Sequence, residues 1–78
     1  HHRDDACFAS PFDGDAALIR KMTASPRVDF VAARGGSPPQ SDACEPQSPH
    51  GYFGVEALVV QVIADWIAGE PLPSSVGP

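Results

Sequence analysis

The chain has 78 residues, room for one small domain at most, and its nine prolines and seven glycines leave space for few regular elements. Its formal net charge is −5, and its five basic residues are scattered instead of forming a stripe, which argues against a nucleic-acid surface. No apolar run approaches the roughly 20 residues of a membrane-spanning helix, and no signal peptide is recognisable, so we expect neither.

The first expected element is a short helix over residues 15–24. Asp13 and Asp15 precede it, and either carboxylate can accept hydrogen bonds from the free N–H groups at a helix start. Three apolar side chains share the face that we expect to be the inner one: Leu18, Ile19 and Met22. Pro26 should end the helix, because the residue before a proline is pushed out of helical geometry.

Residues 27–33, RVDFVAA, are the best candidate for a strand. Apolar side chains alternate onto both faces, which is typical of a parallel strand covered on two sides. The order helix, strand, long loop and helix then indicates the α/β class. One strand makes no sheet, so a parallel neighbour must come from elsewhere, and the extreme N-terminus can supply only part of it.

A long loop rich in proline and glycine covers residues 34–49, and the strongest helix signal follows it. Apolar residues recur there at the spacing of one helical face, which we expect to be buried. They are Val55, Leu58, Val59, Val62, Ile63, Trp66 and Ile67. Gly69 and Pro71 should end this helix and leave residues 71–78 as a flexible tail. His50 stands on a glycine-bounded turn just before the helix begins.

Two loops carry side chains suited to catalysis, Asp4 and Asp5 near the start and His50 before the last helix. A histidine and a carboxylate are the supporting members of a nucleophile–histidine–acid triad, and they must meet in space, not in sequence. Loops at the same end of neighbouring parallel strands would satisfy that requirement. The alternative is an ordinary loop histidine and a pair of capping or solvated aspartates.

The run HHRDDAC followed by SPFDGDAALIRKM resembles the segment that closes the penultimate core strand of α/β-hydrolases. In the same order, RVDFVAARGG resembles their last core strand, and PHGYFGVEALVVQVIADWI resembles their catalytic-histidine loop and closing helix. The resemblance implies that Asp5 is the catalytic acid, with Asp4 as the fallback, and that His50 is the catalytic histidine. Glu56 matches an acidic residue often found after that histidine, whereas His2 stands where glycine is usual.

The resemblance implies that residues 1–70 are the C-terminal part of an α/β-hydrolase sheet (strand end, helix, strand, long loop, helix), incomplete on its own. No Gly-x-Ser-x-Gly turn occurs, so the nucleophile would lie outside this chain, and the remainder of the domain would be its partner. The implied reaction is hydrolysis of an ester, thioester or amide bond of a small acyl substrate, with no cofactor and no metal. The 78-residue chain by itself should not catalyse it.

The two cysteines fit this arrangement, since Cys7 lies two residues after Asp5 and Cys44 lies six before His50. A disulfide between them would join the acid loop to the histidine loop and contribute about 4 kcal/mol in the chain-entropy model. It would also indicate an oxidising compartment, so that the protein is secreted or periplasmic. The alternative is two unrelated thiols.

Two classes without catalysis stay open. One is a small secreted binding module held together by the disulfide. The other is a zinc-binding domain, although no Cys-x-x-Cys or His-x-x-x-His spacing supports it. Its candidate ligands are His1, His2, Asp4, Asp5, Cys7, Cys44 and His50. The Asp13-Gly14-Asp15 stretch lacks the twelve-residue ligand pattern of an EF-hand.

Overall fold

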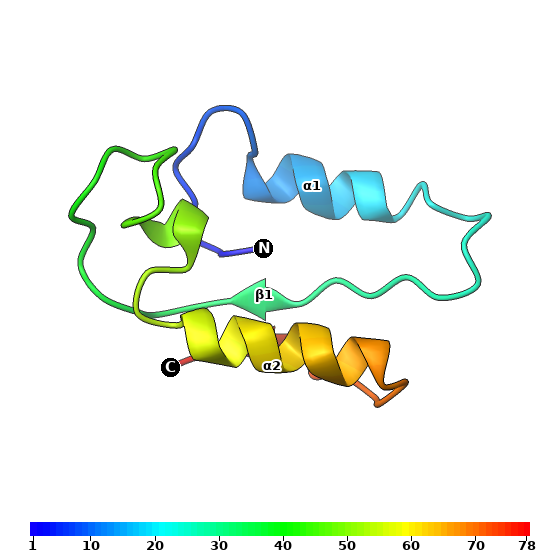
Figure 1. Cartoon of the computed structure of the whole chain (residues 1–78). Helices are drawn as coiled ribbons and strands as arrows, with labels where there is room; N and C mark the ends of the chain where they lie inside the picture. The colour runs from blue at the N-terminus through cyan, green and yellow to red at the C-terminus, as the bar shows by residue number, and fades with distance from the viewer.

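A computed structural model describes all 78 residues as a mixed α/β chain, which confirms the expected class at that level (Figure 1). The elements are helix α1 (Phe12–Ile19), strand β1 (Ala32–Ala33), the 3-10 turn η1 (Pro49–Gly51), helix α2 (Glu56–Ile67) and strand β2 (Ser75–Val76). In the view of Figure 1 the two helices run along either side of the β1 segment. Neither helix is long and apolar enough to cross a lipid bilayer.

Strand β1 is the middle of a small parallel arrangement. It pairs in parallel with β2, with Ala33 opposite Val76. On its other side His2 forms a parallel bridge with Ala33, whose N–H donates to the carbonyl of His1 over 2.9 Å. Parallel neighbours need a crossover connection, and α1 and α2 lie in the two connections. The N-terminus therefore supplies part of the neighbour that the candidate strand lacked.

The boundaries differ from those the sequence predicts. Helix α1 begins directly after Pro11 and ends at Ile19, and neither aspartate of its first turn caps it with a side-chain hydrogen bond. Strand β1 is shorter than the predicted run over 27–33, because only Ala32 and Ala33 pair with residues of β2, and Ala33 alone also pairs with His2 on the other side. The predicted tail over 71–78 contributes a strand that the sequence analysis did not anticipate, β2.

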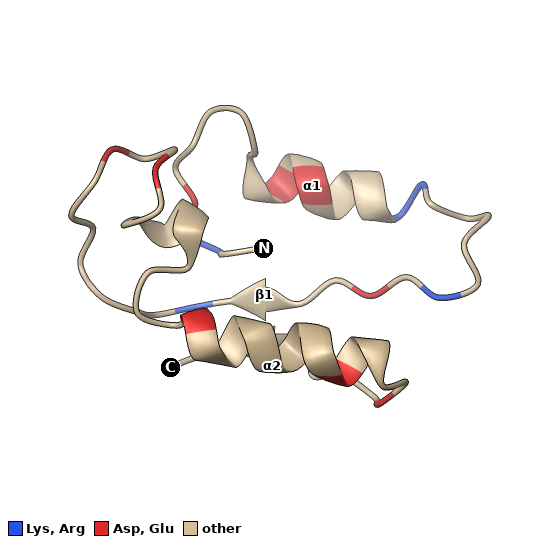
Figure 2. Ribbon diagram, in the orientation of Figure 1, with Lys and Arg blue, Asp and Glu red and all other residues tan.

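The buried interior is small and lies where β1 and its neighbour at His2 end, beside the loops that follow them. Five residues are buried: His2, Cys7, Ala33, Ser48 and Val55. Of the apolar face expected to be buried, only Val55 is buried, just before α2 begins. The expectation is wrong for the rest, because the helix itself contains no buried residue and Ile67 is 75% exposed. A chain this short has too few elements to cover both faces of an apolar helix. Figure 2 displays α2 as uncharged along most of its length, a composition typical of helices buried in larger folds.

A cluster around Arg27 ties the end of α2 to the segment that leads into β1. The Arg27 guanidinium donates to the carbonyl of Glu70 over 2.7 Å and lies over the Trp66 ring, 5.4 Å from its centre. Asp29 accepts hydrogen bonds from both partners, from Arg27 Nε over 2.7 Å and from Trp66 Nε1 over 2.9 Å. The guanidinium also donates to the carbonyl of Trp66 over 3.4 Å, a group in the last turn that a helix end leaves without an intrahelical partner.

Candidate acid–histidine site

Asp5 and His50 meet, as the sequence analysis expected. His50 Nδ1 lies 3.0 Å from Asp5 Oδ2, although 45 positions separate the two residues. The carboxylate is 3% exposed and the imidazole is 35% exposed. A buried acid thus faces one ring nitrogen of a histidine that remains partly open to solvent.

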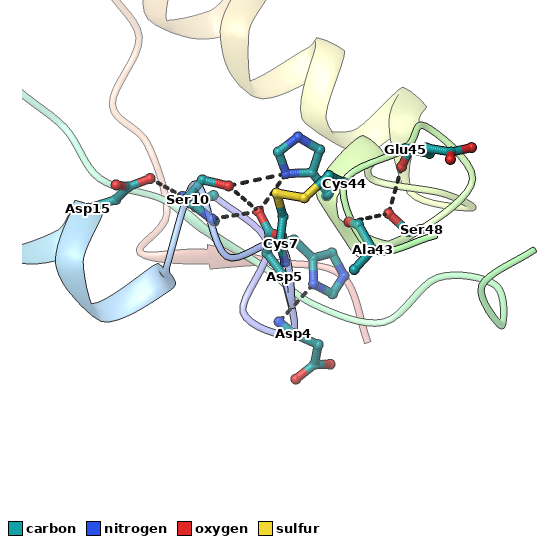
Figure 3. A network of polar contacts seen from close by, with 12 residues as sticks. Asp4, Asp5, Cys7, Ser10, Asp15, Ala43, Cys44, Glu45 and Ser48 are labelled. Atoms are coloured by element: carbon teal, nitrogen blue, oxygen red, sulfur yellow. Dashed lines mark hydrogen bonds and ion pairs between the residues drawn. A yellow bond between two sulfur atoms is a disulfide. The ribbon is translucent and has the colours of Figure 1, made fainter. Parts of the chain in front are cut away.

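Four donors converge on the Asp5 carboxylate (Figure 3). The N–H of Cys7 donates to Oδ1 over 2.9 Å, and Ser10 Oγ donates to Oδ2 over 3.1 Å. Burial acts to raise the pKa of Asp5, but hydrogen bonds from Cys7, His50, Ser10 and His1 together outweigh it and leave the pKa below its ordinary value. The carboxyl group is therefore ionised at neutral pH, as the partner of an imidazolium has to be.

The acid loop is shaped by His2, which replaces the glycine usual in the family that the sequence resembles. Its ring is 1% exposed, and both nitrogens have partners. Nδ1 accepts from the N–H of Asp4 over 3.0 Å, and Nε2 donates to the carbonyl of Gly35 over 2.8 Å, which assigns the ring hydrogen to Nε2. His2 therefore acts as a structural residue here. Asp4, the fallback acid, points its carboxylate away from the network in Figure 3.

His50 occupies the middle of η1, and the backbone around it has little freedom. The buried Ser48 before the turn places its hydroxyl against the carbonyls of Ala43 and Glu45, at 3.0 and 2.7 Å. Gly51 has no room for a side chain, since a Cβ atom there would lie 2.6 Å from Pro46 Cα. The loop preceding η1 and the turn itself are therefore packed together, which fixes the backbone that carries the imidazole.

The disulfide between Cys7 and Cys44 is present, with the two Cα atoms 4.7 Å apart. It joins the acid loop to the loop before His50. The Asp5 carboxylate binds the backbone of Cys7 directly, so the disulfide and the acid share one loop. A disulfide is compatible with an extracellular or periplasmic location.

The second ring nitrogen of His50 is open. Nδ1 faces Asp5 and Ser10, whereas Nε2 has no hydrogen-bond partner in the chain and is not buried. An imidazole in this state can take a proton at Nε2 while the carboxylate stabilises the resulting charge. Glu56 does not take part, because its carboxylate accepts from the backbone N–H of Gly54 at the start of α2.

Two residues at the site were missed by the sequence analysis as partners of Asp5. The His1 ring lies between two carboxylates, with Nε2 2.9 Å from Asp5 Oδ2 and Nδ1 2.7 Å from Asp15 Oδ2. Ser10 Oγ lies 3.2 Å from His50 Nδ1. The only sequence signal for either was its nearness to Asp5 along the chain, which does not distinguish them from other polar loop residues.

An open apolar groove of about 480 Å³ adjoins the site. Most of its lining is aliphatic or aromatic, and it includes Ile19, Met22, Val31, Val59, Ile63 and Trp66. Of the residues in the polar network around Asp5, only His1 lines the groove; Tyr52 lines it as well. Burial, followed by the charges of Asp5 and Asp15, raises the pKa of the Tyr52 hydroxyl. Asp5 and His50 themselves do not line the groove, so the free Nε2 of His50 faces solvent outside the groove.

The candidate zinc ligands do not gather into a site. No group of three or more His, Cys, Asp or Glu side chains is arranged to hold a metal ion. Cys7 and Cys44 are joined to each other and have no thiolate to offer.

Comparison of the chain with protein-family models, with curated proteins and with solved structures gave no significant match. What the site can do is therefore inferred from its geometry.

Proposed function

We propose that residues 1–70 are the acid-and-histidine portion of a serine-type enzyme with the α/β-hydrolase fold. The observation that carries this proposal is the 3.0 Å contact between His50 Nδ1 and the buried Asp5 carboxylate, with Nε2 left free. Two further observations agree with it. Both loops follow parallel neighbours of one sheet, and the motifs occur in the order acid, helix, strand, histidine, helix.

In this proposal His50 acts through Nε2. It takes the proton of a nucleophilic hydroxyl as that oxygen attacks the carbonyl carbon of an ester, thioester or amide. Asp5 holds the ring and stabilises the imidazolium. The same proton then passes from Nε2 to the leaving group, and water repeats the sequence to release the acid. The nucleophile and the oxyanion hole come from polypeptide outside residues 1–78.

The exposed apolar surface supports the idea of a larger domain. Large apolar side chains on both helices and just past the end of α1 stay exposed: Leu18, Met22, Leu58, Val60, Ile63, Trp66 and Ile67. Burying apolar surface stabilises a fold by about 25 cal/mol per Å², so these side chains represent stability that this chain does not realise alone. The remainder of the hydrolase domain is the partner that the proposal assigns to them.

The test uses the complete polypeptide that carries these residues, expressed from its own gene with an affinity tag. The wild type should hydrolyse a p-nitrophenyl acyl ester and react with a fluorophosphonate, a reagent for activated serines. His50→Ala and Asp5→Asn should each lower kcat by roughly 10³-fold or more. Asp4→Asn removes the neighbouring exposed carboxylate and should leave kcat unchanged. Hydrolysis that survives His50→Ala would refute the proposal.

A second candidate function is a small secreted binding module without catalysis. The disulfide and the open groove favour it, because the chain would then be held together by the crosslink and would take an apolar ligand. This module should melt cooperatively by circular dichroism as the isolated 78-residue chain, at a temperature lowered by reductant. A largely disordered spectrum would exclude the module and agree with the hydrolase portion.

A further inference from the structure

Ser10, Asp5 and His50 form a triangle of polar contacts. Ser10 Oγ lies 3.1 Å from Asp5 Oδ2 and 3.2 Å from His50 Nδ1, and the third side, between Oδ2 and Nδ1, is 3.0 Å. We propose that Ser10 is a positioning residue that fixes the ring tautomer of His50. Its importance for catalysis rests on the proposed function, whereas its effect on the tautomer does not.

The assignment follows from the hydrogens available. An ionised carboxylate only accepts, so the Ser10 hydroxyl hydrogen goes to Asp5 Oδ2 and a lone pair of Oγ faces His50. Nδ1 then faces two acceptor oxygens, Oδ2 and Oγ. Two lone pairs aimed at a bare nitrogen would repel it, so Nδ1 carries the hydrogen and Nε2 keeps its lone pair. That is the tautomer a general base needs.

Ser10 Oγ is important as a second acceptor for His50 Nδ1 because several donors compete for Asp5 Oδ2. The same oxygen also accepts from His1 Nε2 over 2.9 Å, so three donors share it while Oδ1 takes the Cys7 N–H. The hydrogen bond from His50 Nδ1 to Oδ2 is therefore shared with two other donors to the same oxygen. Ser10 supplies an additional acceptor for Nδ1 and, by donating to Oδ2, holds that oxygen against rotation of the carboxyl group.

Ser10 does not have the position of a nucleophile. Its hydroxyl lies on the Nδ1 side of the ring, which is the side of the acid. A serine activated by His50 has to approach Nε2 instead, and Ser10 donates its hydrogen to Asp5 rather than to the imidazole. The hydroxyl thus acts through His50 and not on a substrate.

The test is NMR of the complete polypeptide labelled with 15N-histidine, at an alkaline pH at which a free imidazole is neutral. Long-range proton–nitrogen correlation distinguishes the two tautomers, and His50→Gln assigns the signals. His50 should carry its hydrogen on Nδ1 in the wild type. Ser10→Ala should raise the fraction with hydrogen on Nε2 several-fold, whereas Ser10→Thr keeps the hydroxyl and should restore the wild-type pattern.

Ser41→Ala is the matched control, because the Ser41 hydroxyl is exposed and contacts only the carbonyl of Asp42. A wild-type His50 protonated mainly on Nε2 would overturn the inference, even if Ser10→Ala did not fold. An unchanged tautomer in folded Ser10→Ala would also overturn it. In turnover assays Ser10→Ala should lower kcat by roughly tenfold with KM unchanged. A polypeptide without hydrolase activity would refute the proposed function while leaving the NMR result intact.

Discussion

His50 Nδ1 lies 3.0 Å from Asp5 Oδ2 because two separate constraints bring their loops together. The first is the sheet, in which the backbone of residues 1–3 pairs with Ala33. The second is the disulfide, which closes a loop of 37 positions between Cys7 and Cys44. Either constraint alone would leave one of the loops free to move, so the contact depends on both.

Asp5→Asn should remove an acid-dependent part of the stability. Folding lowers the pKa of Asp5 below its ordinary 3.8, so the stability that this group contributes is fully present above that value and is lost as pH falls through the lower, folded pKa. Urea denaturation across an acid pH series should give a steeper loss for the wild type than for Asp5→Asn. At neutral pH the variant should be less stable by about 1–3 kcal/mol. Asp4→Asn serves as the control, and equal slopes for wild type and Asp5→Asn would contradict the prediction.

Replacing both cysteines by alanine should destabilise the protein and weaken the acid–histidine contact. A crosslink that closes a loop of 37 positions contributes about 4 kcal/mol in the chain-entropy model. Thermal unfolding of the wild type should shift to lower temperature when reductant is added, and the double variant should not respond to it. A wild-type transition that reductant leaves unmoved would mean that the disulfide does not form in solution.

The sequence was sufficient to predict the class, the last helix and the meeting of Asp5 with His50. Periodicity predicts a helix such as α2 well, and parallel strands place the loops that follow them at one edge. Which residues of α2 are buried could not be predicted, because burial depends on what packs against the helix and not on its own pattern. The apolar residues do lie at the spacing of one helical face of α2, but Ile67 on that face remains largely exposed.

The parts that were missed depend on tertiary geometry. Strand β2 lies in a segment rich in proline, serine and glycine, PLPSSVGP, which has no alternating apolar pattern to mark a strand. Ser10 reaches Asp5 because a turn folds the chain back on itself, with the Ser10 N–H donating to the carbonyl of Cys7 over 3.2 Å. His1 reaches Asp5 across an earlier turn, in which the Asp5 N–H donates to the carbonyl of His2 over 3.2 Å. A polar residue in a loop gives no sequence sign of which acceptor it will meet.

Gly51→Ala should displace His50 from Asp5. The added methyl group would overlap the backbone of Pro46, and no flexible side chain is available to move aside. Overpacking of this kind typically costs about 1–3 kcal/mol, or more where backbone must shift. Histidine-selective NMR should detect an altered His50 ring environment. Gly69→Ala is the control, because its methyl meets no atom within 4 Å. Its φ of +79° should lower stability by about 1 kcal/mol without affecting His50.

Arg27→Lys should loosen the end of α2 although the charge is kept. A lysine cannot contact Asp29 and the carbonyl of Glu70 together as the guanidinium does, and it stacks less well on Trp66. The expected loss is about 1 kcal/mol, because the pair is partly exposed and screened by water. Tryptophan fluorescence should change as well. Arg34→Lys is the control, at an exposed arginine whose side chain makes no hydrogen bond, and it should change neither the stability nor the fluorescence. Equal losses of stability in both variants would argue against a stabilising role for the Arg27 cluster.

The Tyr52 hydroxyl should titrate above its ordinary pKa of 10.0. Burial opposes formation of the phenolate, and the charges of Asp5 and Asp15 oppose it further. Because Tyr52 is the only tyrosine, its ultraviolet absorbance can be followed directly during an alkaline titration.

Asp15→Asn should move the Tyr52 midpoint part of the way back toward 10.0, since burial and Asp5 remain, and Asp13→Asn should leave it unchanged. The folded state holds this proton more tightly than the unfolded state, so stability should decline as pH rises through the folded pKa. A midpoint at or below 10.0 in the folded wild type would show that Tyr52 is neither buried nor close to the two carboxylates in solution.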